Sequence, residues 1–286
     1  MLNNSSKKIV VLFDEYGTPS FDFTTGQNVF LGVAVLYELN EEENIFKSCN
    51  KCMGLSRSKE LKNDKIDVNR AIEISCVIGE QRLSILARYI LLDNRTLNEI
   101  VEDYKKFGDI SRQLFRGIKK ERKVAQILYQ QILAICISQI ILRYLENADA
   151  GNYEFEIFVD YWDYPLPDKH IDSKYFNSLL EDKVQRFVVD NIKKDVKVSI
   201  KTKQFLKATD RKREYFIGVL TSVVSRVCRD EKDSKYDLRL LTEMQNKLGN
   251  NFNIEDTTND LISALREGIT VFIQETKEKD KKLLIY

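Results

Sequence analysis

The chain has 286 residues, of which 43% are hydrophobic and 31% are charged. This composition supplies a substantial core and excludes a disordered chain. Its 45 basic and 44 acidic side chains leave a formal net charge of +1, so there is no chain-wide positive field of the kind that indicates nucleic-acid binding. Only three prolines and eleven glycines occur, which favours long regular elements.

No segment of the sequence predicts export or membrane insertion. Residues 1–8 are mostly polar, and the apolar run that follows, Ile9–Phe13, is short. A membrane span needs about 18 or more apolar residues. The longest candidate, Ile127–Leu145, is interrupted by three glutamines and an arginine. We therefore expect a soluble cytoplasmic protein that has no membrane partner.

The five cysteines predict no disulfide framework, because their number is odd and no secretory signal precedes them. Cys49 and Cys52 form a lone Cys-x-x-Cys pair, but a zinc site needs two further ligands, and His170 is the only histidine. We interpret the pair as two cysteines at the end of a helix. Nucleophilic mechanisms that use histidine would all depend on His170, which lies in a polar loop, and we discount them.

Five segments have the patterns of β-strands. Ile9–Phe13 is continuously apolar, as expected of a strand that is covered on both faces, and turn residues follow it at Gly17-Thr18-Pro19. Lys197–Phe205 alternates apolar and charged residues and predicts an edge strand. The other predicted strands are Val29–Tyr37, Leu83–Leu92 and Glu154–Asp160.

Helices are predicted between and after these strands. The strongest is Glu121–Glu146, which is apolar on most sides and should be deeply packed. The others are Glu41–Cys52, Asp67–Val77, Thr96–Lys106, Tyr175–Val189, Arg211–Arg229, Asp237–Leu248 and Glu255–Thr276. We expect one α/β domain over residues 1–286, with a helical insertion at about 94–150 and a C-terminal helical extension at about 236–276.

Two of the predicted strands end on an aspartate, Asp14 and Asp160. Ligands of open α/β sheets bind beyond the carboxyl ends of strands, so both side chains should lie at the mouth of a cavity. Because successive side chains alternate between the faces of a strand, we assign the inward position to Asp14 and an outer position to Glu15. Aspartates on adjacent strands can share magnesium ions that promote phosphodiester cleavage. An aspartate that only begins a turn or caps a helix explains the same pattern.

Short motifs near these aspartates resemble a known family. Phe13-Asp14-Glu15-Tyr16-Gly17, followed by Phe30-Leu31-Gly32-Val33-Ala34, is similar to the opening of the family catalogued as domain of unknown function 3800. That family opens with an Asp-Glu-Ser-Gly turn and a Phe-Val-Leu-Gly-Gly strand, so Tyr16 here replaces the usual serine. Lys59-Glu60-Leu61-Lys62 and Phe158-Val159-Asp160 resemble two of its later motifs. The resemblance spans roughly residues 8–230.

The resemblance implies a ribonuclease H-like fold, which is a mixed five-stranded sheet with helices on both sides. It also implies that Asp14, Glu60 and Asp160 are catalytic carboxylates that bind Mg²⁺ or Mn²⁺. Family members complete this site with an aspartate in a late helix, but Ile217–Thr221 of this chain holds no carboxylate. We prefer Glu214 as the fourth catalytic and metal ligand, because Asp210 stands at the start of the helix, where aspartate caps free amides.

The implied activity is that of a metal-dependent nuclease, in a bacterial system directed against phages or mobile DNA. Basic side chains around the carboxylates would hold phosphates without reading bases, although a solvated helix start explains such a cluster equally well. The predicted nucleic-acid contacts are Lys59, Lys62, Lys207, Arg211 and Lys212, and Lys201, Lys203 and Arg213 lie in the same stretch.

The alternative is a catalytically degenerate ribonuclease H-like module that acts as an interaction or assembly subunit. The missing late-helix aspartate favours it, and its partner would be another protein or a second copy of the chain. A nucleotide-binding enzyme has little support, because neither glycine-rich phosphate-binding motif occurs.

Overall fold

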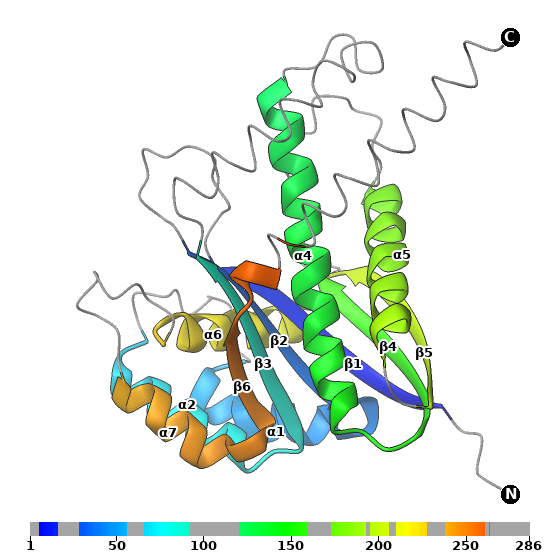
Figure 1. The fold of residues 1–286 in the computed structure, drawn as a ribbon. Coiled ribbons are helices and arrows are strands. Elements are labelled where there is room, and N and C mark those ends of the chain that lie inside the picture. The colour runs from blue at the N-terminus through cyan, green and yellow to red at the C-terminus, as the bar shows by residue number, and fades with distance from the viewer. Residues whose placement is uncertain are drawn as a thin grey trace, which may run out of the picture.

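A mixed β-sheet with helices on both faces forms the centre of the computed structural model (Figure 1). The structure describes residues 6–16, 29–55, 66–91, 120–159, 173–192, 195–205, 210–227, 238–260 and 263. The strands are β1 (Lys7–Tyr16), β2 (Val29–Glu38), β3 (Leu83–Leu91), β4 (Gly151–Val159), β5 (Val196–Gln204) and β6 (Phe252–Asp256). The helices are α1 (Glu42–Met53), α2 (Val68–Gly79), α4 (Lys120–Glu146), α5 (Ser173–Asn191), α6 (Arg211–Ser225) and α7 (Leu238–Leu248), and short 3-10 helices lie at Leu39–Glu41 and Gly249–Asn251.

The six strands follow the order β5-β4-β1-β2-β3-β6. β1 pairs antiparallel with β2, and β2 pairs antiparallel with β3. On the other side β4 is parallel to β1, with Leu12 opposite Phe158, and β5 is parallel to β4. The carboxyl ends of β1, β4 and β5 therefore point to the same end of the sheet.

Two hydrophobic cores lie on the two faces of this sheet. Along β1, Val11 and Phe13 pack toward α4 and α5, whereas Val10 and Leu12 pack toward α1, α2, α6 and α7. All four side chains are buried. This double coverage explains the continuous apolar run and confirms the prediction that the first strand is covered on both faces.

Most of the predicted elements are confirmed in the described residues. Five strands and six helices appear within a few residues of their predicted bounds, and β5 lies at a sheet edge as predicted. The predicted helix Thr96–Lys106 lies outside the described residues. The helix predicted from Glu255 is wrong at its start, because residues 252–256 form β6, which pairs with β3. The described part of the sheet therefore has six strands, one more than the five that were expected.

β6 is fixed to β3 by a buried arginine. Arg88 of β3 is buried under α4, and its Nη1 donates a hydrogen bond of 2.7 Å to Oδ1 of Asn253. Its Nη2 lies 3.3 Å from Oε2 of Glu255. Burial lowers the pKa of Arg88, and the neighbouring Glu255 opposes that effect. A buried charge is tolerated only with such partners, so β6 completes the environment of Arg88.

Three of the outer backbone groups of β5 are hydrogen-bonded to side chains of α5. Gln185 donates from Nε2 to the carbonyl oxygen of Val198 (3.0 Å) and accepts at Oε1 from the amide of Ile200 (2.9 Å). Oε2 of Glu181 accepts from the amide of Thr202 at 2.9 Å. These bonds replace the pairing that a further strand would supply.

Gly32 of β2 leaves room for an aromatic ring and for the close approach of α4. A β-carbon at this position would lie 2.9 Å from Cζ of Phe13 and 3.3 Å from Cβ of Cys136. We expect Gly32→Ala to lower the free energy of unfolding by about 2 kcal/mol through overpacking. Urea denaturation measures this change. Gly218→Ala is the control, because nothing lies within 4 Å of its added β-carbon, and it should stabilise α6 by about 0.5–1 kcal/mol. Equal effects of the two substitutions would contradict the steric argument.

Candidate functional site

Asp14 lies inside β1 rather than at its end. The strand continues to Tyr16, and Asp14 pairs with Val33 of β2. By strand alternation its side chain shares the face of Val10 and Leu12, which α6 covers, and it is half-buried. Glu15 is also half-buried and belongs to the opposite face. The expectation that β1 ends at Asp14 is therefore wrong, and alternation still separates the two carboxylates.

Two of the predicted ligands, Glu60 and Asp160, lie outside the described residues, as do the predicted contacts Lys59, Lys62 and Lys207. The structure does describe residues that flank Glu60 and Asp160 in the sequence. Val159 is the last residue of β4, which runs parallel to β1. Leu55 and Ile66 precede and follow the segment that holds Glu60, and both are buried in the core on the α6 face. The chain therefore enters and leaves that segment on the same face as Asp14.

Glu214 lies in the first turn of α6 and is half-buried. α6 packs on β1 and β2, so this carboxylate comes from a helix on the same face as Asp14. Asp210 occupies the N-cap position, but its side chain forms no capping hydrogen bond. Its Oδ1 instead lies 3.3 Å from Nη1 of Arg213. The prediction that the Asp210 carboxylate caps the helix is therefore wrong.

Ile217–Thr221, where the resemblance places the missing aspartate, is almost entirely core. Ile217, Val219 and Leu220 are buried against the sheet, and Thr221 is buried as well. Oγ1 of Thr221 has no hydrogen-bond partner among the described residues. This part of α6 contributes packing to the α6 face.

Arg213 holds the start of α6 against α1 and β4. Its Nε and Nη2 donate hydrogen bonds of 2.8 and 2.9 Å to the carboxylate of Glu42, which also accepts one of 2.7 Å from the hydroxyl of Tyr37. The guanidinium carbon lies 4.4 Å from the centre of the Phe158 ring. Burial and the adjacent Glu42 raise the pKa of Tyr37. Sequence reasoning placed Arg213 in a basic patch, but its donors are directed to carboxylates.

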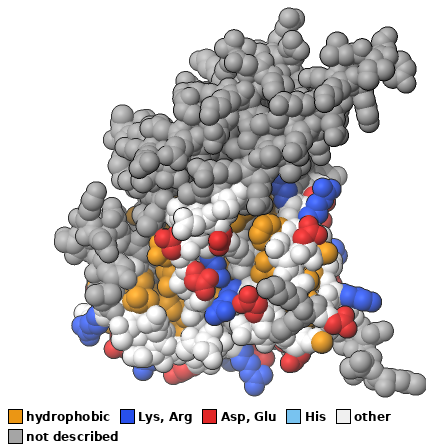
Figure 2. Space-filling view, viewed as in Figure 1, with side chains coloured by type: hydrophobic (Ala, Val, Ile, Leu, Met, Phe, Trp, Pro, Cys, Tyr) orange, Lys and Arg blue, Asp and Glu red, His pale blue; other side chains and the backbone are white. Residues whose placement is uncertain are grey.

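The lysines of β5 are paired with glutamates of β4. Nζ of Lys201 lies 3.0 Å from Oε1 of Glu154, and Nζ of Lys203 lies 2.8 Å from Oε1 of Glu156. The hydrogen bond from Lys201 lowers the pKa of Glu154. The predicted contacts Arg211 and Lys212 are exposed in the first turn of α6. On the other face of the sheet, basic and acidic side chains are interspersed, as Figure 2 shows for the described part.

No group of three or more His, Cys, Asp or Glu side chains that could hold a metal ion occurs within the described ranges. Only Asp14 and Glu214 of the four predicted ligands belong to those ranges. Their types fit the expected ion, because hard carboxylate oxygens are what magnesium and manganese prefer.

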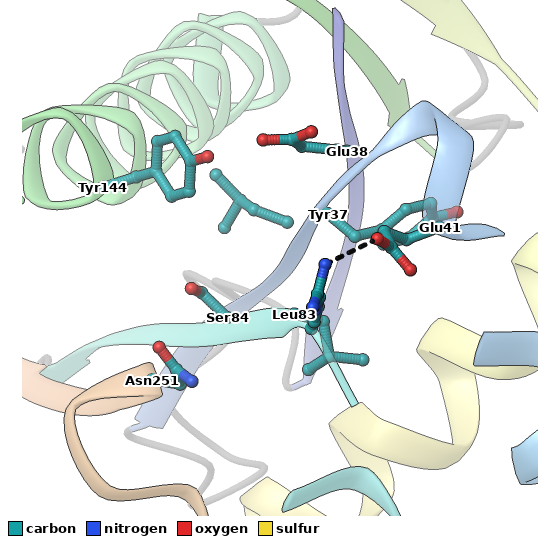
Figure 3. Close-up of a pocket in the computed structure, with 9 residues that line it drawn as sticks. Tyr37, Glu38, Glu41, Leu83, Ser84, Tyr144 and Asn251 are labelled. Atoms are coloured by element: carbon teal, nitrogen blue, oxygen red, sulfur yellow. Dashed lines mark hydrogen bonds and ion pairs between the residues drawn. The ribbon is translucent and has the colours of Figure 1, made fainter. Parts of the chain in front are cut away.

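A hollow of about 320 Å³ lies where β2 ends and β3 begins (Figure 3). Tyr37, Glu38 and Ser84 line it together with Tyr144 of α4, and Glu41 pairs with Arg82 at 3.4 Å. Burial raises the pKa of Tyr144 to about 12. Tyr37 pairs with Val10, four residues before Asp14, which is about 13 Å along the strand. The hollow is therefore separate from the predicted carboxylates.

The Cys-x-x-Cys pair lies near the end of a helix, as the sequence predicted. Cys49 and Cys52 lie within α1 as free, buried thiols. Burial raises the pKa of Cys49 to about 12 and also raises the pKa of Cys52. Cys136 is buried and has its pKa raised to about 12 by the same cause.

Because the thiolate is the reactive form, we expect iodoacetamide at pH 8 to alkylate Cys49, Cys52 and Cys136 at least about a hundredfold more slowly in the folded protein than in urea. Peptide mass spectrometry measures each rate, and the half-buried Cys76 is the internal reference. Rapid alkylation of Cys49 in the folded protein would refute its assignment as core.

In the part of the chain that the structure describes, no helix combines the length and the apolar character that a membrane crossing requires. A scan against protein-family models finds no match to this chain, and a search of curated proteins finds none either.

Proposed function

We propose that this chain is a divalent-metal-dependent nuclease of the ribonuclease H-like type. The observation that carries the proposal is the placement of Asp14. It stands on the α6 face of β1, near the carboxyl end of the parallel neighbour β4. Ligand sites of α/β sheets form at such carboxyl ends. The next residue of the sequence after β4 is Asp160, which we propose as the second aspartate of the site.

The sheet supports a ribonuclease H-like arrangement. In its first five strands β1, β2 and β3 are antiparallel, whereas β4 and β5 run parallel to β1, and helices cover both faces. This is the kind of mixed sheet that the resemblance to domain of unknown function 3800 implies. β6 is then an additional strand beside β3.

The proposed ligands are Asp14, Glu60, Asp160 and Glu214. Carboxylates of this kind would hold Mg²⁺ or Mn²⁺, and the ions would supply an activated water and stabilise the leaving oxygen of a phosphodiester. Other residues of the chain hold these carboxylates in position. Arg213 does so for α6, because its bonds to Glu42 fix the helix turn that carries Glu214.

The test is a cleavage screen on single- and double-stranded DNA and RNA of about 30 nucleotides. We expect cleavage with Mg²⁺ or Mn²⁺ and none with EDTA, because hard oxygen ligands require such an ion. Calorimetric titration with Mn²⁺ should detect binding in the absence of nucleic acid. Absence of both cleavage and Mn²⁺ binding would overturn the proposal.

A second candidate is the degenerate module, which the buried, carboxylate-free stretch Ile217–Thr221 favours. Such a module would bind no divalent ion and would assemble with a protein partner or a second copy. Calorimetry separates the two functions, because only the nuclease needs the ion. Binding of Mn²⁺ that disappears in the Asp14→Asn variant favours the enzyme.

A further inference from the structure

The outer part of the α6 face is an open, charged strip of sheet. α6 packs on β1 and β2, and α5 packs on the opposite face of β5. None of the described helices has its main packing on the α6 face of β4 and β5. Asn152, Ser199 and the buried Phe158 share this face with a set of charged side chains. We call the charged set the lysine ladder: Lys8 of β1, Glu154 and Glu156 of β4, and Lys197, Lys201 and Lys203 of β5.

The lysine ladder carries more positive than negative charge. Its four lysines face two glutamates, and the exposed Arg211 and Lys212 stand at the start of the neighbouring α6. The side chains of Lys201 and Lys203 are 56% and 45% exposed, whereas those of Glu154 and Glu156 are 21% and 23% exposed. The ammonium groups therefore form the outer layer of the strip, and the carboxylates lie below them.

The ion pairs of the lysine ladder orient the lysine side chains but are weak enough for another anion to replace the glutamates. Exposed ion pairs contribute about 0–1 kcal/mol each, so a phosphate can take the place of a glutamate at little cost. Alternate residues of a strand are about 7 Å apart on one face, which gives Lys201 and Lys203 a regular spacing along β5. A row of ammonium groups suits a chain of phosphates better than a single anion.

We propose that the lysine ladder holds the phosphate backbone of a nucleic-acid strand and leads it to the carboxylates at the end of the sheet. β4 and β5 run parallel to β1, so the lysine ladder extends along these strands toward the carboxyl end of the sheet, where Asp14 lies. Lysine contacts to phosphate read no bases, so the ladder gives affinity without sequence preference. This inference rests on the proposed function for its substrate, and the binding test below needs no catalysis.

The test compares two opposite changes to the same ladder. Fluorescence anisotropy with labelled 30-nucleotide DNA and RNA in EDTA measures affinity between 50 and 200 mM salt. Lys201→Gln/Lys203→Gln should weaken binding about tenfold and reduce the salt slope by about 2. Glu154→Gln/Glu156→Gln should tighten binding, because it removes the carboxylates that compete with phosphates for the lysines.

The control is Arg82→Gln/Arg143→Gln, which removes two positive charges from exposed ion pairs away from the ladder. It should leave the affinity within about twofold of wild type, since screened charges far from the contact contribute little. Circular dichroism checks that every variant is folded. Equal weakening by the lysine variant and the control, or no nucleic-acid binding by the wild type, would overturn the ladder.

The two proposals fail in different ways. If the protein shows cleavage that depends on Asp14 but the ladder variants bind nucleic acid like wild type, the ladder proposal is wrong and the nuclease proposal stands. If the ladder variants alter binding as expected but the protein shows neither metal-dependent cleavage nor Mn²⁺ binding, the nuclease is wrong and the ladder stands.

Discussion

Asp14→Asn is expected to reduce Mg²⁺- or Mn²⁺-dependent cleavage at least about a hundredfold, since even the loss of a group that only supports a metal ligand costs about 10–100-fold. Asparagine keeps the size of the side chain in β1 but removes the anionic charge that would hold the proposed ion. Asp14 is half-buried, and its backbone pairs with Val33 in the β-sheet. This pairing does not depend on the charge of the Asp14 side chain, so the fold should persist. Initial cleavage rates and the midpoint of urea unfolding measure the two effects.

The neighbouring residue supplies a matched control. Glu15 is the next carboxylate along β1 and is also half-buried, but strand alternation directs it to the face of Phe13. Glu15→Gln removes one charge from the same strand and should keep cleavage within about threefold of wild type. Equal losses in the two variants would mean that the charge of β1, and not the position of Asp14, governs activity.

Glu42→Gln is expected to lower the free energy of unfolding by about 2 kcal/mol, which lies in the range for hydrogen bonds to charged groups. Glu42 accepts hydrogen bonds from Arg213 and from Tyr37. The side chains of Glu42 and Arg213 are only 22% and 17% exposed, so water compensates the loss poorly. Urea denaturation followed by circular dichroism measures the change.

Glu146→Gln is the control for Glu42→Gln. Glu146 pairs with Arg143 at 3.0 Å on α4, and these side chains are 60% and 41% exposed. Because an exposed pair contributes about 0–1 kcal/mol, this variant should remain close to wild type. A change of similar size in both variants would show that burial of the Arg213 pair has no energetic consequence.

The β-sheet was largely predictable because burial leaves a strong signal in the sequence. The apolar run of β1 and the alternation of β5 each follow directly from the faces that the structure covers or exposes. β6 was missed because Phe252 and Ile254 are its only apolar residues, and two apolar positions cannot distinguish a short strand from a helix start. The contacts of β6 are with residues distant in the chain: it pairs with β3, and Asn253 bonds to Arg88, 165 residues away.

The candidate site was predictable only in part, for a related reason. Alternation along β1 places Asp14 and Glu15 on opposite faces from sequence alone. The partners of Arg213 could not be foreseen, because Glu42 precedes it by 171 residues and comes next to it only when α1 packs beside α6. A run of basic residues in the sequence shows how much positive charge a segment carries. It does not show which acidic side chains will pair with it, because that depends on which helices and strands pack together.

The hydrogen bonds from α5 to the outer side of β5 affect how this chain meets other chains. A foreign strand can extend a sheet only where backbone donors and acceptors are available, and such extension is a common start of aggregation. At β5 the side chains of Gln185 and Glu181 already bond to three of those groups, the carbonyl oxygen of Val198 and the amides of Ile200 and Thr202. Among the described strands the opposite edge is β6, which has 5 residues and offers a short template. Sheet extension is therefore disfavoured at these two edges of the described sheet.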